Sequence, residues 1–186
     1  MKYYTEIDKL PELEKSFHNA CVDGNLNQIK KLINSKKINI HCNNDAGFLL
    51  ACSNGHLDIV DYFLTSPELK KHIDINTNDD MGFLNACFRG QLHIVKYLLT
   101  SPKLNKYSNI HAYKDRAFEI TCQHNNLELA QFLIIDMNIK KTWHINRHLK
   151  ESENSEIRNY FKVRKFKEQL NSELTTNHVA SNKFKI

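Results

Sequence analysis

The sequence predicts an all-α solenoid of stacked helix pairs, because one stretch of the chain recurs at a nearly fixed spacing. The stretch FLLACSNGHLDIVDYFL at residues 48–64 returns as FLNACFRGQLHIVKYLL at 83–99 and as FEITCQHNNLELAQFLI at 118–134. A fainter copy, FHNACVDGNLNQIKKLI, occupies residues 17–33. The phenylalanines that open the four copies lie 31, 35 and 35 residues apart, and one cysteine and one leucine keep the same spacing. Self-similarity at such a period is typical of repeat architectures.

Each copy has the pattern of two short antiparallel helices. Phe48, Ala51 and Cys52 lie at positions i, i+3 and i+4, which form one face of a first helix. Asn54-Gly55-His56 interrupts this pattern, since glycine supplies the backbone freedom of a tight turn. Apolar residues then recur at helical spacing over residues 57–64, which predicts the second helix.

The segment that follows the second helix predicts a turn and then an extended finger. Thr65-Ser66-Pro67 ends the helix, because proline cannot continue it. Residues 72–76 alternate polar and apolar side chains as an extended strand would. Asn78-Asp79-Asp80 supplies turn residues before the next copy opens.

This arrangement resembles the ankyrin repeat. The resemblance is carried by Gly55-His56-Leu57-Asp58-Ile59-Val60, with Ala51-Cys52 before it, and it covers roughly residues 17–140. The family usually opens its first helix with Thr-Pro-Leu-His, where this chain has Ala46-Gly47-Phe48-Leu49. A Ser-Pro turn inserted after the second helix accounts for a period of 35, against about 33 in the standard repeat. The resemblance therefore implies stacked helix pairs with short fingers.

The expected organisation follows from the register of the copies. Residues 1–15 form an N-terminal lead-in, and residues 16–141 form four repeats at about 16–42, 43–77, 78–112 and 113–141. Residues 142–174 form a C-terminal capping region whose basic helix spans 151–174, with Ile157, Tyr160 and Phe161 facing the core and Val163 continuing along a neighbouring stripe. Residues 175–186 have no periodicity, and we expect a flexible tail there.

No catalytic, cofactor-binding or metal-binding residue is predicted. The sequence contains no HExxH, CxxC, phosphate-loop or GxSxG motif. Cys21, Cys52, Cys87 and Cys122 hold the same place in successive copies, where a small core residue fits. Equivalent helices of stacked repeats lie about 10 Å apart, too far for a disulfide. His56 is expected to form a hydrogen bond near the helix–helix turn. We therefore do not expect an enzyme.

The ends and hydropathy of the chain bear on where the protein is found. The opening MKYYTEIDKLPELEKS has no apolar leader, and the longest uninterrupted apolar run, residues 48–52, is far shorter than a membrane span. We therefore expect a protein that is cytoplasmic where it is made, or delivered from there into a host cell, and that does not enter a membrane.

Ankyrin arrays are binding modules, so the resemblance implies a protein partner that contacts the finger tips and the exposed side of the first helices. For Phe88 two interpretations stay open: a binding hot spot beside Arg89, rimmed by the charges at residues 79–80 and 114–116, or sideways packing against the next repeat. The candidate partner-binding residues are Asn43, Asn44, Asp45, Asn54, Asn78, Asp79, Asp80, Phe88, Arg89, Tyr113, Lys114, Asp115, Arg116, Gln123 and His124.

Charge supports an alternative function. Residues 140–186 hold 11 Lys/Arg and 5 Asp/Glu, a net charge of +6, whereas residues 1–139 hold 15 and 16, a net charge of −1. A basic patch on the C-terminal helix could bind nucleic acid or another acidic surface, with the repeats as scaffold. That patch comprises Arg158, Lys162, Arg164, Lys165 and Lys167.

The preferred hypothesis is a non-catalytic adaptor or inhibitor of a partner protein. The composition is rich in lysine and asparagine and poor in alanine and glycine, which favours a source with an AT-rich genome. Ankyrin proteins from such sources are often bacterial, phage or viral factors that capture a host or defence protein, and we carry this over as a family-level expectation.

Overall fold

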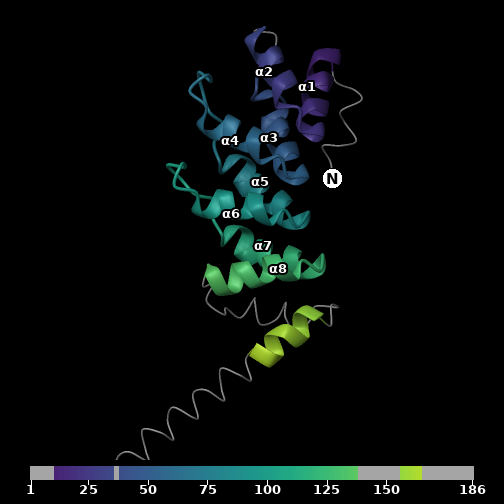
Figure 1. The fold of residues 1–186 in the computed structure, drawn as a ribbon, viewed down its shortest axis with the longest axis vertical. Coiled ribbons are helices and arrows are strands. Elements are labelled where there is room, and N and C mark those ends of the chain that lie inside the picture. Colours follow the sequence, from purple (N-terminus) through teal and green to yellow (C-terminus); the bar gives the residue numbers. More distant parts are fainter. Residues whose placement is uncertain (1–10, 36–37, 138–155, 165–186) are drawn as a thin grey trace, which may run out of the picture.

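The computed structural model describes residues 11–35, 38–137 and 156–164, in which four helix pairs stack along one axis (Figure 1). Repeat 1 contains α1 (Glu12–Asp23) and α2 (Leu26–Asn34), and repeat 2 contains α3 (Cys42–Asn54) and α4 (Leu57–Thr65). Repeat 3 contains α5 (Thr77–Phe88) and α6 (Leu92–Thr100). Repeat 4 contains α7 (Ala112–Gln123) and α8 (Leu127–Gln131), which continues as the π-helix η2 (Phe132–Asp136). The predicted all-α repeat fold is confirmed.

The first helices α1, α3, α5 and α7 pack side by side and form an inner layer, which the second helices cover on one side. The phenylalanine that opens each copy is buried in this layer. Gly47 and Gly82 make the close stacking possible: a Cβ at Gly47 would lie 2.7 Å from the ring of Phe17, and one at Gly82 would lie 2.5 Å from the ring of Phe48. The ring of one repeat thus occupies the space that the next repeat leaves open.

The four repeat cysteines, Cys21, Cys52, Cys87 and Cys122, lie on the buried face of the first helices as predicted, each as a free thiol. Burial raises the pKa of all four thiols, because the interior disfavours the thiolate. The fifth thiol, Cys42, is only half-buried, and burial followed by the nearby Glu14 carboxylate raises its pKa to about 11.

Each first helix is followed by a residue in the left-handed conformation, as helix ends commonly are. Gly24, Gly55 and Gly90 take this role at φ 76°, 82° and 68°, and Asn125 takes it in repeat 4 at φ 58°. The second helix of each pair begins two residues after this left-handed residue, so a single change of conformation reverses the direction of the chain.

The turns of successive repeats are joined by hydrogen bonds. His56 Nε2 donates to the carbonyl of Val22 in the previous repeat (2.6 Å). Gln91 Nε2 donates to Ser53 O (3.2 Å), and Asn126 Nδ2 donates to Cys87 O (3.3 Å). His56 and Gln91 thereby satisfy carbonyl groups at the end of a helix, whereas Cys87 O also accepts from the N–H of Gly90 (3.2 Å). The structural role predicted for His56 is confirmed.

The inserted Ser-Pro turn closes with local hydrogen bonds. In repeat 2 the N–H of Leu69 donates to Ser66 O (3.1 Å), and in repeat 3 the N–H of Leu104 donates to Ser101 O (3.1 Å). The segment after the first turn, residues 72–76, buries Ile73 and Ile75 as the alternation predicts. It is not a strand, and residues 11–35, 38–137 and 156–164 contain none. The N–H of Ile73 donates to Phe63 O of α4, and no ladder of backbone hydrogen bonds joins residues 72–76 to the neighbouring loop.

The two finger tips Asn43–Asp45 and Asn78–Asp80 each form one turn of left-handed helix, with φ between 50° and 61°. Asparagine and aspartate tolerate this conformation better than other residues with a side chain. The two turns are stacked, since Asn78 Nδ2 donates to Asn44 O (2.7 Å) and Thr77 Oγ1 donates to the Asp45 carboxylate (2.5 Å). The predicted turn at residues 78–80 is therefore present, in a form that the sequence pattern did not specify.

A helical segment at residues 156–164 packs on the end of the stack. Ile157 and Phe161 are buried, and the ring of Phe161 lies edge-on to Phe118 of α7, with 6.4 Å between the ring centroids. Val163 is 55 % exposed, so the prediction that it continues the apolar stripe is wrong: it lies on the solvent side of the helix. The other parts of the expected capping helix and the expected tail lie outside the described residues.

Replacing Phe83 with alanine should lower the free energy of unfolding by about 3–5 kcal/mol, because a fully buried aromatic ring is deleted. Urea denaturation followed by circular dichroism measures this loss. Tyr107→Ala is the matched control, since this ring is 49 % exposed and should change stability by no more than about 0.5 kcal/mol. A loss below about 1 kcal/mol for Phe83→Ala would contradict the assignment of the core.

Asn44 tests the left-handed turn, because its side chain is exposed and its φ is 54°. Asn44→Val should destabilise the protein by about 1–2 kcal/mol, since a β-branched residue is strained at positive φ. Asn44→Gly should leave stability unchanged or slightly higher, since glycine adopts this conformation without steric cost. Equal stability of the valine and glycine variants in thermal unfolding would show that the turn is not left-handed.

Candidate interaction surface

The first helices of repeats 3 and 4 leave one continuous face open. On α5 and α7 the exposed and half-buried side chains recur at the three-, four-, seven- and eight-residue spacings of a single helix face. The two helices pack side by side, so we treat their faces as one surface, the inner-helix face. It comprises Met81, Asn85, Phe88 and Arg89 of α5 with Arg116, Glu119, Ile120, Gln123 and His124 of α7.

The corresponding face of repeat 2 is closed. Leu50 and Ser53 hold the positions of Asn85 and Phe88 in α3, and they are only 2 % and 7 % exposed. Asn54, a predicted site residue, is half-buried, and its Nδ2 donates to Leu50 O of its own helix (2.8 Å). This face is therefore closed in repeat 2 and open in repeats 3 and 4; at the matching positions of α1, Asn19 and Asp23 are also exposed.

Phe88 is the last residue of α5 and lies at one end of this face, between two polar neighbours. Its ring centroid is 4.2 Å from that of His124 in the next repeat, and the guanidinium of Arg89 lies 5.6 Å from the ring. The ring is half-buried, so it packs sideways against repeat 4 and still presents an edge to solvent. The contact with His124 confirms the sideways packing of Phe88, and the hot-spot interpretation stays a prediction.

His124 is held in one orientation. Its Nδ1 lies 3.0 Å from Ile120 O, and since a carbonyl only accepts, Nδ1 carries the proton and donates. The exposed Nε2 is then available to accept a hydrogen bond from a ligand. The cluster of Phe88, Arg89 and His124 thus combines a stacked aromatic ring, a cation and a hydrogen-bond acceptor.

A polar network continues the face along α7. Arg116 Nη1 pairs with Glu119 Oε2 at 2.6 Å, and Glu119 Oε1 accepts from Gln123 Nε2 at 3.2 Å. Glu119 thus links the exposed side chains of Arg116 and Gln123 along one side of the helix. The network fixes the direction of these groups, which lowers the entropy cost of binding.

The finger tips form the other half of the predicted site, and only part of them is exposed. Asn43, Asn44 and Asp79 are exposed, and Asn78 is half-buried. Asp80 is 7 % exposed, and its carboxylate accepts from the Asn109 N–H (3.0 Å) and from Asn76. The Asp80 carboxylate is therefore part of the internal hydrogen bonding of the fold and does not contribute to the open surface.

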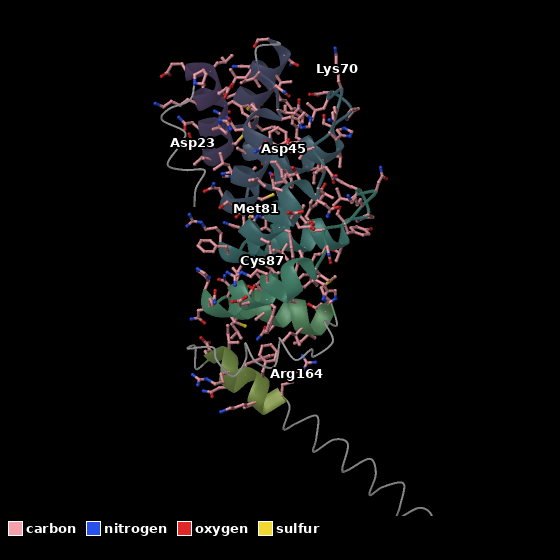
Figure 2. The ribbon with its side chains drawn as sticks, turned by 180° about the vertical axis from the view of Figure 1, so that it is seen from behind. Asp23, Asp45, Lys70, Met81, Cys87 and Arg164 are labelled. Carbon is pink, nitrogen blue, oxygen red and sulfur yellow. The ribbon has the colours of Figure 1, made fainter. Side chains whose placement is uncertain are left out.

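Asp45 has a similar structural function. Its carboxylate accepts from Thr77 and lies 2.7 Å from His41 Nδ1, so both oxygens are used within the repeats. Figure 2 shows Asp45 within the stack, between the first helices and the loops. The side chains of Tyr113, Lys114 and Asp115 lie outside the described residues.

The charges of the finger tips do not surround Phe88 as expected. Asp79 lies in the left-handed turn that opens α5, whereas Phe88 is the last residue of that helix. Arg116 and His124 are separated in the same way on α7. The half-buried Met81, Asn85, Glu119 and Ile120 connect the two ends, and these residues were missed in the sequence. Their helical spacing from Phe88 and His124 was the signal that could have found them.

The basic patch is only partly described. Lys162 is exposed, whereas Arg158 and Arg164 are half-buried and each interacts with other residues of the protein. Lys165 and Lys167 lie outside the described residues. A nucleic-acid interface on this helix therefore stays a prediction.

The described residues contain no group of three or more His, Cys, Asp or Glu side chains that could hold a metal ion. No described helix combines the length and the apolar character that crossing a membrane requires.

Comparison with known families gives one match: residues 17–106 match the family model of ankyrin repeats in 3 copies. The chain matches no curated protein and no solved structure. Ankyrin repeats are a protein–protein interaction module and are generally non-catalytic. The match spans the helix pairs of repeats 1–3, and the inter-repeat hydrogen bonds extend the same pattern into repeat 4. Residues 17–106 of this chain are therefore a set of ankyrin repeats.

Proposed function

We propose that the protein binds a partner protein through the inner-helix face and the exposed finger tips of repeats 3 and 4. It acts there as a non-catalytic adaptor or inhibitor. The proposal is supported by the family, whose repeats bind proteins, and by the open face on α5 and α7, which repeat 2 lacks.

The observation that carries the proposal is the cluster of Phe88, Arg89 and His124. Arginine and large aromatic side chains contribute much of the energy in many protein interfaces, in particular where they are already packed on one side. Phe88 is fixed by His124 and Arg89, so little rotamer freedom is lost when a partner covers it. The polar network on α7 and the exposed Asp79 supply the charged periphery that directs the approach of a partner.

We further propose that the partner is a host or defence protein captured by a bacterial, phage or viral factor. The lysine- and asparagine-rich composition supports this finer assignment by association with AT-rich sources only.

The double substitution Phe88→Ser and Arg89→Asn tests the binding surface, because repeat 2 folds with Ser53 and Asn54 at these positions. It should lower the affinity for the partner by at least about 2 kcal/mol, roughly thirtyfold in Kd, since two hot-spot side chains are removed. Affinity purification from nuclease-treated lysate of the source cell, with wild type as reference, identifies the partner. Isothermal titration calorimetry with that purified partner then measures the Kd of each variant.

Two further variants serve as controls. Lys31→Glu changes an exposed residue of α2, far from repeats 3 and 4, and should bind like wild type. Lys162→Glu changes the basic helix and should also bind like wild type. A partner that is retained by the double variant but lost with Lys162→Glu, with an affinity that falls steeply with salt, would overturn the proposal in favour of the basic patch.

A further inference from the structure

A second, separate concave site lies between the two inserted loops, on the side of the stack away from the inner-helix face. The Ser-Pro loops, residues 66–76 and 101–111, both project beyond α4 and α6 in Figure 1, and Figure 2 shows Lys70 on one of them. A cavity of about 250 Å³ lies between them. Repeat 1 has no Ser-Pro turn, so this groove arises from the insertions in repeats 2 and 3.

The groove has an apolar floor and a polar margin. Its floor is formed by aliphatic residues of both repeats, of which Ile73, Ile75 and Leu104 are already buried in the fold. The volume of the cavity suffices for one or two side chains, and it lies below the range of typical small-molecule pockets. The full lining is Leu64, Thr65, His72, Ile73, Asp74, Ile75, Lys103, Leu104, Asn105 and Lys106.

The margin has an excess of positive charge. The two loops hold four lysines, at positions 70, 71, 103 and 106, against the carboxylates Glu68 and Asp74, which leaves a net charge of +2 with the histidines neutral. Glu68 pairs with Lys30 of α2 at 3.5 Å, so it does not offset the lysines nearer the groove. Lys70 and Lys71 are exposed and make no ion pair with any residue of the described chain.

The two lysines that line the groove are held in weak, exchangeable ion pairs. Lys103 Nζ lies 3.3 Å from Asp61, and Lys106 Nζ lies 3.2 Å from Asp74. The lysine side chains are 64 % and 60 % exposed, and pairs as exposed as these contribute about 0–1 kcal/mol. A carboxylate of a ligand can therefore replace Asp61 or Asp74 as the partner of these lysines at little cost in free energy.

The backbone beside the groove offers further donors. The N–H groups of His72 and Asp74 make no hydrogen bond to any other part of the described chain, although the N–H of Ile73 between them donates to Phe63 O. Ammonium and N–H groups both favour ligands rich in carboxylate and carbonyl oxygens.

We propose that this groove binds a short extended segment of a partner protein, with an aliphatic side chain in the cavity and carboxylates on both sides of it. The aliphatic side chain would contact the floor, and the flanking carboxylates would pair with Lys103 and Lys106. The site is independent of the inner-helix face, because it is built from the loops that follow the second helices.

A fluorescein-labelled octapeptide, Gly-Glu-Glu-Leu-Leu-Glu-Glu-Gly, is the probe, and fluorescence anisotropy measures its binding to the full chain. Wild type should bind it saturably. Lys103→Glu with Lys106→Glu should weaken binding by at least about tenfold, because attraction becomes repulsion. Lys31→Glu with Lys162→Glu makes the same change of charge at exposed positions outside the groove and should bind like wild type. The Phe88→Ser, Arg89→Asn variant should also bind like wild type.

Three results would overturn the proposal. The first is absence of saturable binding by wild type. The second is an equal loss in both charge-reversal variants, which would indicate attraction to the overall charge only. The third is a lack of selectivity, seen either as equal binding of a peptide in which both leucines are serine or as tighter binding of an oligonucleotide of equal charge. Circular dichroism of each variant checks that a loss of binding does not come from unfolding.

Discussion

The stack depends on the contact between the phenylalanine of one repeat and a glycine in the first helix of the next. Phe17 lies against Gly47 and Phe48 against Gly82, in both cases closer than any side chain would allow. A Cβ added at Gly47 would also lie 3.1 Å from the sulfur of Cys21, and one added at Gly82 would lie 3.3 Å from the sulfur of Cys52. The ring and the thiol together fill the space that the glycine leaves, so neighbouring first helices can approach closely. This packing explains why the phenylalanine and the cysteine recur at the repeat spacing.

The close approach determines where surface is left for binding. The first helices α3 and α5 enter the layer through stacked left-handed turns, and the turns that end the four first helices are joined by hydrogen bonds. Only the side of each first helix that faces away from the core can vary without disturbing the stack. In repeat 2 this part is covered, whereas in repeats 3 and 4 it carries Phe88 and the α7 network. The insertions after the second helices create an independent groove on the other side.

The sequence predicted the helix pairs, their phenylalanine and cysteine core and the docking of Phe161, because periodic burial leaves a periodic pattern. It did not predict features that depend on contacts between repeats. Asp80 looked like an exposed turn residue, but its carboxylate accepts hydrogen bonds from Asn109, in the loop after α6, and from Asn76 of the previous repeat. Residues 72–76 have strand alternation, but no ladder of backbone hydrogen bonds joins them to the neighbouring loop. The Ser-Pro insertion was recognised as a departure from the family, whereas the groove formed by two such loops requires their relative position.

The most direct test of this account is the stability of Gly82→Ala. Alanine in place of a helical glycine normally stabilises a protein by about 0.5–1 kcal/mol. Here the added methyl group would lie 2.5 Å from the ring of Phe48, so we expect a net loss of about 1–3 kcal/mol from overpacking. The reverse change at the equivalent position of repeat 4, Ala117→Gly, should cost no more than about 1 kcal/mol. A free energy of unfolding that rises for Gly82→Ala would contradict the packing on which the stack depends.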